Sequence, residues 1–115
     1  MADIARINQE LTDFSRKLAV ASNEYTEACL DAAIKRSDSD VAQAKAMLKA
    51  EGKTVSDRES EVAVICETVI REARISEAVR DALKERIRAL QSVLNATQTR
   101  AAFLKAEMQL AGKDY

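Results

Sequence analysis

The chain has 115 residues, and its 18 Lys and Arg against 19 Asp and Glu give a formal net charge of −1. A nearly neutral chain has no long-range field to attract nucleic acid or anionic lipid, and no apolar run reaches the roughly 18 residues of a membrane span. There is no His or Pro, and Gly52 and Gly112 are the only glycines. These absences exclude His-dependent triads, the usual zinc sites and glycine-rich phosphate loops. We therefore expect one non-enzymatic, all-α domain over residues 1–115, with no cofactor or metal.

The first predicted helix covers residues 4–51, and Asp3 is its expected N-cap. Its apolar residues alternate spacings of three and four, which keeps one stripe facing a partner helix as in a coiled coil. This stripe consists of Ile4, Ile7, Leu11, Phe14, Leu18, Ala21, Tyr25, Ala28 and Ala32.

Ser and Asp at residues 37–39 interrupt this pattern, because their side chains compete for backbone hydrogen bonds. The helix either stops there and restarts with Ser37 as a cap, or runs through with a kink. Helical spacing then resumes and ends at Gly52, with apolar positions at Val41, Ala44, Met47 and Leu48.

A turn is predicted at residues 52–55, followed by a second helix over 56–111. Ser56 and Glu59 have the spacing of a capping box at its start. This helix keeps the same repeat, with one polar interruption near Ser76 and Arg80. Its positions are Val62, Cys66, Val69, Ala73, Ser76, Leu83, Ile87, Leu90, Leu94, Thr97, Ala101, Leu104 and Met108. Two long helices joined by a short turn predict a long antiparallel, coiled-coil-like hairpin. The alternative is a compact bundle in which the chain folds back again near Ser37 or Ser76.

The two cysteines, Cys29 and Cys66, are expected to be buried free thiols. In a hairpin centred on the predicted turn, Cys29 faces Ala78 and Cys66 faces Val41. The two sulfurs would then lie too far apart for a disulfide.

Several apolar residues fall outside the stripes that pair the two helices. They are Val20, Ile34, Val64, Ile65, Ile70, Ile75, Val79, Val93 and Phe103. Left in water, they would form a larger apolar patch than soluble monomers usually expose. We therefore expect a homo-oligomeric helical bundle, with an interface for a second copy or another protein formed by Ile65, Ile70, Ile75, Val79, Val93 and Phe103.

Basic residues gather in the last third of the chain, where five of them accompany a single Glu85. They are Lys84, Arg86, Arg88, Arg100 and Lys105. One interpretation is a solvated face whose charge complements the C-terminal end of the helix dipole. The other is a set of phosphate contacts to nucleic acid, although no aromatic residues are interleaved to stack bases.

The segments 54–59 (TVSDRE) and 88–96 (RALQSVLNA) together resemble small helical proteins of temperate bacteriophages, often found among recombination and replication genes. The similarity extends over about residues 53–110. It implies a phage or prophage origin and an accessory role near DNA transactions. The segment Met1–Ile4 does not resemble a signal peptide, so the expected location is the cytoplasm, that of the host cell for a phage protein.

The sequence thus favours a phage-type helical interaction protein that acts through an oligomeric coiled-coil surface. Two alternatives remain open. One is direct nucleic-acid binding by the basic residues between 84 and 105, and the other is a structural or virion-assembly role.

Overall fold

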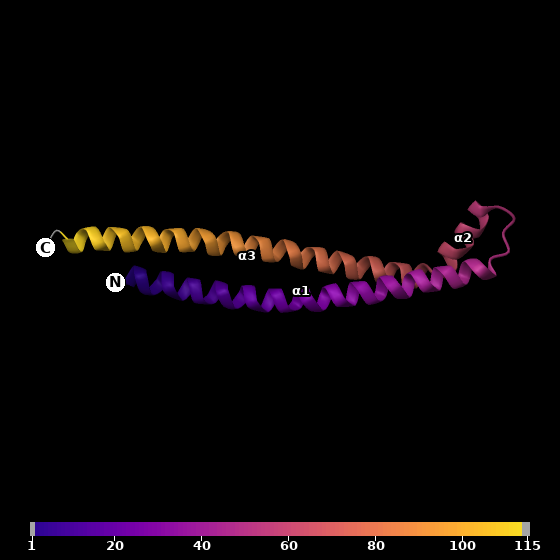
Figure 1. Cartoon of the computed structure of the whole chain (residues 1–115), viewed down its shortest axis with the longest axis horizontal. Helices are drawn as coiled ribbons and strands as arrows, with labels where there is room; N and C mark the ends of the chain where they lie inside the picture. The colour runs from indigo at the N-terminus through magenta and orange to yellow at the C-terminus, as the bar shows by residue number, and fades with distance from the viewer. Residues whose placement is uncertain (1, 114–115) are drawn as a thin grey trace. The chain divides into compact units, whose positions relative to one another are not determined.

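The computed structural model describes residues 2–113, which form three helices and no strand (Figure 1). They are α1 (Ala2–Lys49), α2 (Val55–Ile65) and α3 (Glu67–Lys113). This confirms the predicted all-α class. Within the described part of the chain, each helix is too short or too polar to cross a membrane.

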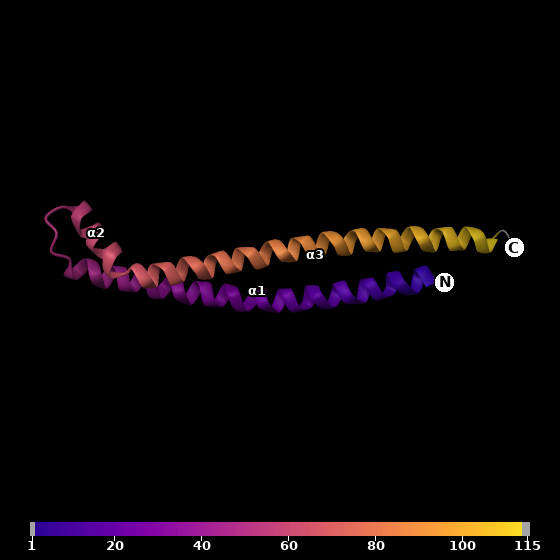
Figure 2. The same cartoon turned by 180° about the vertical axis from the view of Figure 1, so that it is seen from behind.

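The chain divides into two compact units. Unit 1 combines Met1–Glu24 with Lys84–Tyr115, and unit 2 covers Tyr25–Leu83. In each unit a segment of α1 runs antiparallel beside a segment of α3 (Figure 1, Figure 2). In unit 2 a turn and α2 join these segments, so unit 2 forms a helical hairpin that corresponds to the central part of the predicted one.

The helix α1 is uninterrupted at residues 37–39. Ser39 is only 2% exposed, and its hydroxyl accepts a hydrogen bond of 3.0 Å from Gln43 Nε2. A serine with this local partner does not need to end the helix to satisfy its hydroxyl. Because α3 is also continuous through Ser76, the chain does not fold back at either predicted point.

The buried face of α1 beyond Ala32 differs from the predicted one. Val41, Met47 and Leu48 are exposed, whereas the buried residues are Ser39 and Ala46. These two positions continue the spacing of the first stripe, which ends in the prediction at Ala32. Continuity of the heptad repeat therefore outweighs the greater hydrophobicity of Val41 and Leu48.

The start of α2 also differs from the prediction. Thr54, rather than Ser56, is the N-cap, and its Oγ1 accepts a hydrogen bond of 3.0 Å from the Asp57 amide. Asp57 thus occupies the position predicted for Glu59. Similarly, Asp3 lies in the first turn of α1 rather than at its N-cap, and its charge suits that end of the helix dipole.

The predicted second helix over 56–111 is divided at Cys66, which has φ −96° and ψ 13°. The Cys66 amide still donates to Val62 O at 2.8 Å, and the Ile70 amide donates to Cys66 O at 2.9 Å. The helix therefore changes direction without losing these backbone hydrogen bonds, and α2 leaves at an angle to α3 (Figure 1). At the bend, Val62, Cys66 and Ala46 form one buried cluster.

Small side chains fill the interface between α1 and α3 in both units, where the rest of the predicted repeat lies, except that Met108, its predicted last member, is exposed. In unit 2 the buried residues of these two helices are Ala32, Ser39, Ala46, Ala73 and Ser76, with Val62 of α2 and Cys66 at the bend buried beside them, and in unit 1 they are Ile7, Ala21, Thr97 and Ala101. The larger side chains of the repeat, among them Leu11, Phe14, Leu90 and Leu94, are half-buried beside them. We call this interface the seam.

Candidate interaction surfaces

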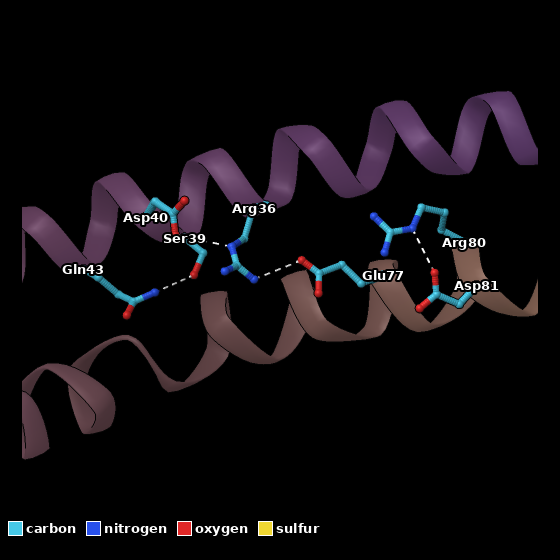
Figure 3. A network of polar contacts seen from close by, with 7 residues as sticks. All are labelled: Arg36, Ser39, Asp40, Gln43, Glu77, Arg80 and Asp81. Atoms are coloured by element: carbon cyan, nitrogen blue, oxygen red, sulfur yellow. Dashed lines mark hydrogen bonds and ion pairs between the residues drawn. The ribbon is translucent and has the colours of Figure 1, made fainter.

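Polar contacts connect α1 and α3 at the edge of the seam in unit 2 (Figure 3). Arg36 lies between two carboxylates, with Nη1 3.1 Å from Glu77 Oε1 on α3 and Nε 3.5 Å from Asp40 Oδ1 on α1. Nearby, Ser76 Oγ donates to Asp31 Oδ2 at 3.1 Å across the seam. The ion pairs are solvent-exposed and add little stability, but the Arg36–Glu77 and Ser76–Asp31 contacts show how the two helices are aligned.

This alignment determines which residues the two cysteines face. Cys29 lies two residues before Asp31, and Ala78 lies two residues after Ser76, so the Ser76–Asp31 bond supports the predicted pairing of Cys29 with Ala78. Both thiols are free, with Cys29 half-buried and Cys66 buried. Cys66 packs against Ala46, rather than facing Val41 as predicted.

Tyr25 and Arg80, both in unit 2, have shifted acid–base properties. A hydrogen bond with the Cys29 side chain, one helical turn along α1, raises the pKa of Tyr25 above its ordinary value. The ion pair with Asp81, in which Arg80 Nε lies 3.0 Å from Asp81 Oδ1, raises the pKa of Arg80 (Figure 3). Both shifts favour the protonated forms, so at neutral pH Tyr25 is uncharged and Arg80 is charged.

The residues predicted to form an interface on α2 and α3 are exposed, with one exception. In unit 2, Ile65, Ile75 and Val79 are exposed, with Ile65 at 67%. Ile70 is instead half-buried against the Ala46–Val62–Cys66 cluster, because the bend at Cys66 turns this part of α3 inward. In unit 1, Val93 and Phe103 are exposed, with Phe103 at 68%.

Phe103 borders an apolar groove of about 450 Å³ between the α1 and α3 segments of unit 1. Its other apolar lining residues are Ile7 and Leu104, and charged residues of both signs also line it: Asp3, Arg6, Arg100 and Glu107. Such a groove suits an apolar side chain of a partner better than it suits a charged ligand.

The five basic residues of α3 are all exposed, but they do not form one stripe. At about 100° per residue, Lys84 and Arg88 lie on one side of the helix, and Arg86 and Arg100 lie near the opposite side. Lys105 lies between these two sides. Arg88 is paired with Glu85 at 2.9 Å, and Arg100 is 3.4 Å from Glu10 of α1. The geometry therefore does not gather the basic residues on one surface for a phosphate backbone.

The sequence prediction missed an apolar face of α1 in unit 2. Its residues are Leu30, Ile34, Ser37, Val41, Ala44 and Leu48, all of them exposed, and we call this set the outer stripe. Leu48 is the most exposed of its large side chains, at 88%. Of these residues, the prediction places only Ile34 outside the seam and takes Val41, Ala44 and Leu48 as seam positions. The signal that would have revealed the outer stripe is its own alternation of four- and three-residue spacings.

Within the described residues there is no group of three or more Cys, Asp or Glu side chains that could hold a metal ion. No protein-family model matches the chain, and comparisons with curated proteins and with solved structures gave no match. The exposed apolar surfaces are therefore the features from which a function can be argued.

Proposed function

We propose that this protein is a non-enzymatic interaction protein that self-associates through exposed apolar side chains of α2 and α3, and binds another protein in the associated form. The observation that carries the proposal is the exposure of Ile65, Ile75 and Val79 in unit 2. Burying each of these side chains in an interface would contribute roughly 1.5–3 kcal/mol. Exposed apolar groups of this kind mark interaction sites in soluble proteins.

Ile75 and Val79 are one helical turn apart on α3, so both present side chains to the same partner surface. In unit 1, Val93 and Phe103 and the groove beside Phe103 offer further apolar contacts. The resemblance to phage proteins suggests that the bound protein acts in DNA recombination or replication. Because the basic residues of α3 lie on different sides of the helix, we assign any link with DNA to this partner.

The experiment is a measurement of mass by multi-angle light scattering at micromolar concentration. The expected mass is at least twice the chain mass of 12.7 kDa. The double variant Ile75→Asp/Val79→Asp should lower it, because it places charge in the proposed interface. Ser92→Asp, at an exposed position on another side of α3, is the matched control and should leave the mass unchanged.

A monomer at all concentrations, or equal effects of the two variants, would contradict the proposed self-association. A titration with single- and double-stranded DNA tests the rival function. Direct phosphate contact would appear as binding that weakens steeply with the logarithm of salt concentration. That result would support direct nucleic-acid binding by the basic residues of α3 instead.

A further inference from the structure

In unit 2 the helix α1 is apolar on two opposite faces, of which α3 covers one. Each residue of the outer stripe follows a seam position by two residues, for example Ile34 after Ala32 and Val41 after Ser39. Two residues correspond to about 200° around the helix. The outer stripe therefore faces away from α3, which agrees with its exposure.

The outer stripe has the pattern of a short coiled-coil strand. In heptad terms, Ile34, Val41 and Leu48 occupy a positions, while Leu30, Ser37 and Ala44 occupy d positions. The same spacing leads to Glu27 before Leu30 and to Glu51 after Leu48, so charge limits the apolar segment at both ends. The β-branched Ile34 and Val41 at a positions suit a two-stranded coiled coil. The small Ser37 and Ala44 would let two such helices approach closely.

Charges beside the outer stripe favour one orientation of a second α1 helix. Asp40 lies at a g position and Lys45 at the e position five residues later, and both are exposed. In a parallel, in-register pair of α1 helices, Asp40 of each copy faces Lys45 of the other, which gives two symmetric ion pairs. In an antiparallel pair centred on the stripe, Asp31 would face Lys45 of the second copy, but Asp38 and Asp40 would each face the same residue of the second copy. Like charges would then meet at the middle of the contact.

We infer that the outer stripe binds the outer stripe of a second copy of this chain, as a parallel, in-register, two-stranded coiled coil over residues 30–48. The inference rests on the proposed function, because both require the protein to self-associate. The contact inferred here lies on a different surface, on α1 instead of α2 and α3. Isolated helices of this length are marginal in water. Here the seam already holds α1 helical, so association does not have to order the helix.

A cysteine at position 37 tests the orientation. In a chain with Cys29→Ala and Cys66→Ala, Ser37→Cys should form a disulfide between copies under mild oxidation, because equivalent d positions face each other in a parallel pair. Ser92→Cys, exposed on α3, is the control and should remain largely uncrosslinked. The antiparallel pair instead places position 37 opposite position 41. Poor bridging by Ser37→Cys alone, with efficient bridging when Ser37→Cys is mixed with Val41→Cys, would overturn the parallel arrangement.

Charge reversal tests the same contact in solution, with native cysteines under reducing conditions. Asp40→Lys should weaken dimerisation by at least about tenfold, and the double variant Asp40→Lys/Lys45→Asp should restore it. Both variants lose the Asp40 contact with Arg36 within the chain, so that loss cannot account for a difference between them. Absence of rescue would overturn the assignment of Asp40 and Lys45 to facing positions.

Val41→Asp separates this inference from the proposed function. It should abolish the Ser37→Cys crosslink while circular dichroism shows unchanged helix content, because Val41 is exposed in the single chain. Ile75→Asp/Val79→Asp should leave the crosslink intact. If the α3 variant lowers the mass and Ser37→Cys does not crosslink, the proposed function stands and this inference fails. If Ser37→Cys crosslinks and the α3 variant has no effect on mass, the inference stands and the proposed surface on α3 fails.

Discussion

Small residues give the seam its geometry. Ala32 is 1% exposed and Ser39 is 2% exposed, and neither has a side chain long enough to separate the helices. In close-packed interfaces, added methylene groups force neighbouring side chains or the backbone to move. Side-chain size at the seam is therefore the main determinant of how closely α1 and α3 approach.

Ala32→Leu tests this directly. The larger side chain should lower the free energy of unfolding by about 1–3 kcal/mol. The adjacent Ala33→Leu, on the exposed side of α1, should change it by less than about 0.5 kcal/mol. Urea denaturation of both variants at low protein concentration provides the comparison, and similar losses in both would mean that Ala32 does not sit in a tight contact.

Tyr25 offers a test of local electrostatics. Its pKa is raised from 10.0, chiefly by the hydrogen bond with Cys29. The protonated phenol is therefore favoured in the folded state. The resulting stabilisation is present below the ordinary pKa of tyrosine and is lost as the pH rises through the folded pKa.

In a Tyr115→Phe background, which leaves Tyr25 as the only tyrosine, phenolate absorbance should appear at higher pH in the folded than in the unfolded chain. Cys29→Ala should move the titration of Tyr25 back toward its ordinary value, whereas Cys66→Ala should not. An unchanged titration in Cys29→Ala would exclude the hydrogen bond as the cause.

At the scale of elements, the turn and the start of α2 depend on two small local features. A Cβ at Gly52 would lie 2.8 Å from Asp57 Cβ and 2.9 Å from the Arg58 nitrogen. Thr54 caps the first turn of α2 through its bond with the Asp57 amide. Both features position the turn against the first residues of α2.

Gly52→Ala should destabilise the chain by about 1–3 kcal/mol, because the added methyl group displaces the first turn of α2. Gly112→Ala is the matched control, since no atom of the described residues lies within 4 Å of a Cβ there. Alanine in that helix should be neutral or stabilising by at most about 1 kcal/mol. Thermal unfolding followed by circular dichroism measures both, and a neutral Gly52→Ala would show that the turn is looser than described.

The N-cap can be assigned by a second pair of variants. Thr54→Ala should lower the free energy of unfolding by about 1 kcal/mol, because it leaves the Asp57 amide without its partner. Ser56→Ala, at the predicted but incorrect cap, should have little effect. The opposite order of the two losses in chemical denaturation would restore Ser56 as the N-cap.

The heptad repeat predicted most of the seam, because spacing alone determines which side of a helix a residue occupies. The prediction of seam residues is wrong beyond Ala32. It places the more hydrophobic Val41 and Leu48 in the seam, whereas the repeat itself leads to Ser39 and Ala46. The N-cap was missed because Thr54 and Ser56 are both good capping residues, and only the three-dimensional path of the turn distinguishes them.

The candidate surfaces were predictable to the extent that they follow from the repeat. The exposure of Ile75, Val79 and Phe103 follows from their positions outside the seam. Ile70 was misassigned because its environment depends on the bend at Cys66. No Gly or Pro lies near this bend to indicate it in the sequence. The packing of this segment against α1 is not visible in the local sequence either.

At the scale of the whole molecule, the alignment of the helices determines the chemistry of the two thiols. Cys29 lies opposite Ala78, and Cys66 precedes Ala78 by twelve residues. This separation corresponds to about 18 Å along the helices, whereas a disulfide requires Cα atoms within about 7 Å. We expect no disulfide between Cys29 and Cys66 of the same chain.

The measurement is thiol titration of the native protein, followed by mass analysis after mild oxidation. Cys29, which is half-buried, should react faster than the buried Cys66, and both should react fully after unfolding. An efficient Cys29–Cys66 bridge within one native chain would show that unit 2 is folded differently.

The composition of the seam also affects how the sequence can change over time. The codons of Ala and most of those of Ser differ only at their first base, so a single base change can exchange these two residues. At Ala32, Ser39 and Ala73, such an exchange adds or removes only one oxygen atom, and the spacing of the buried positions is retained. Descendants of this chain could keep the same helix pairing while losing residue identity, so they would be recognised by the size and spacing of their seam residues.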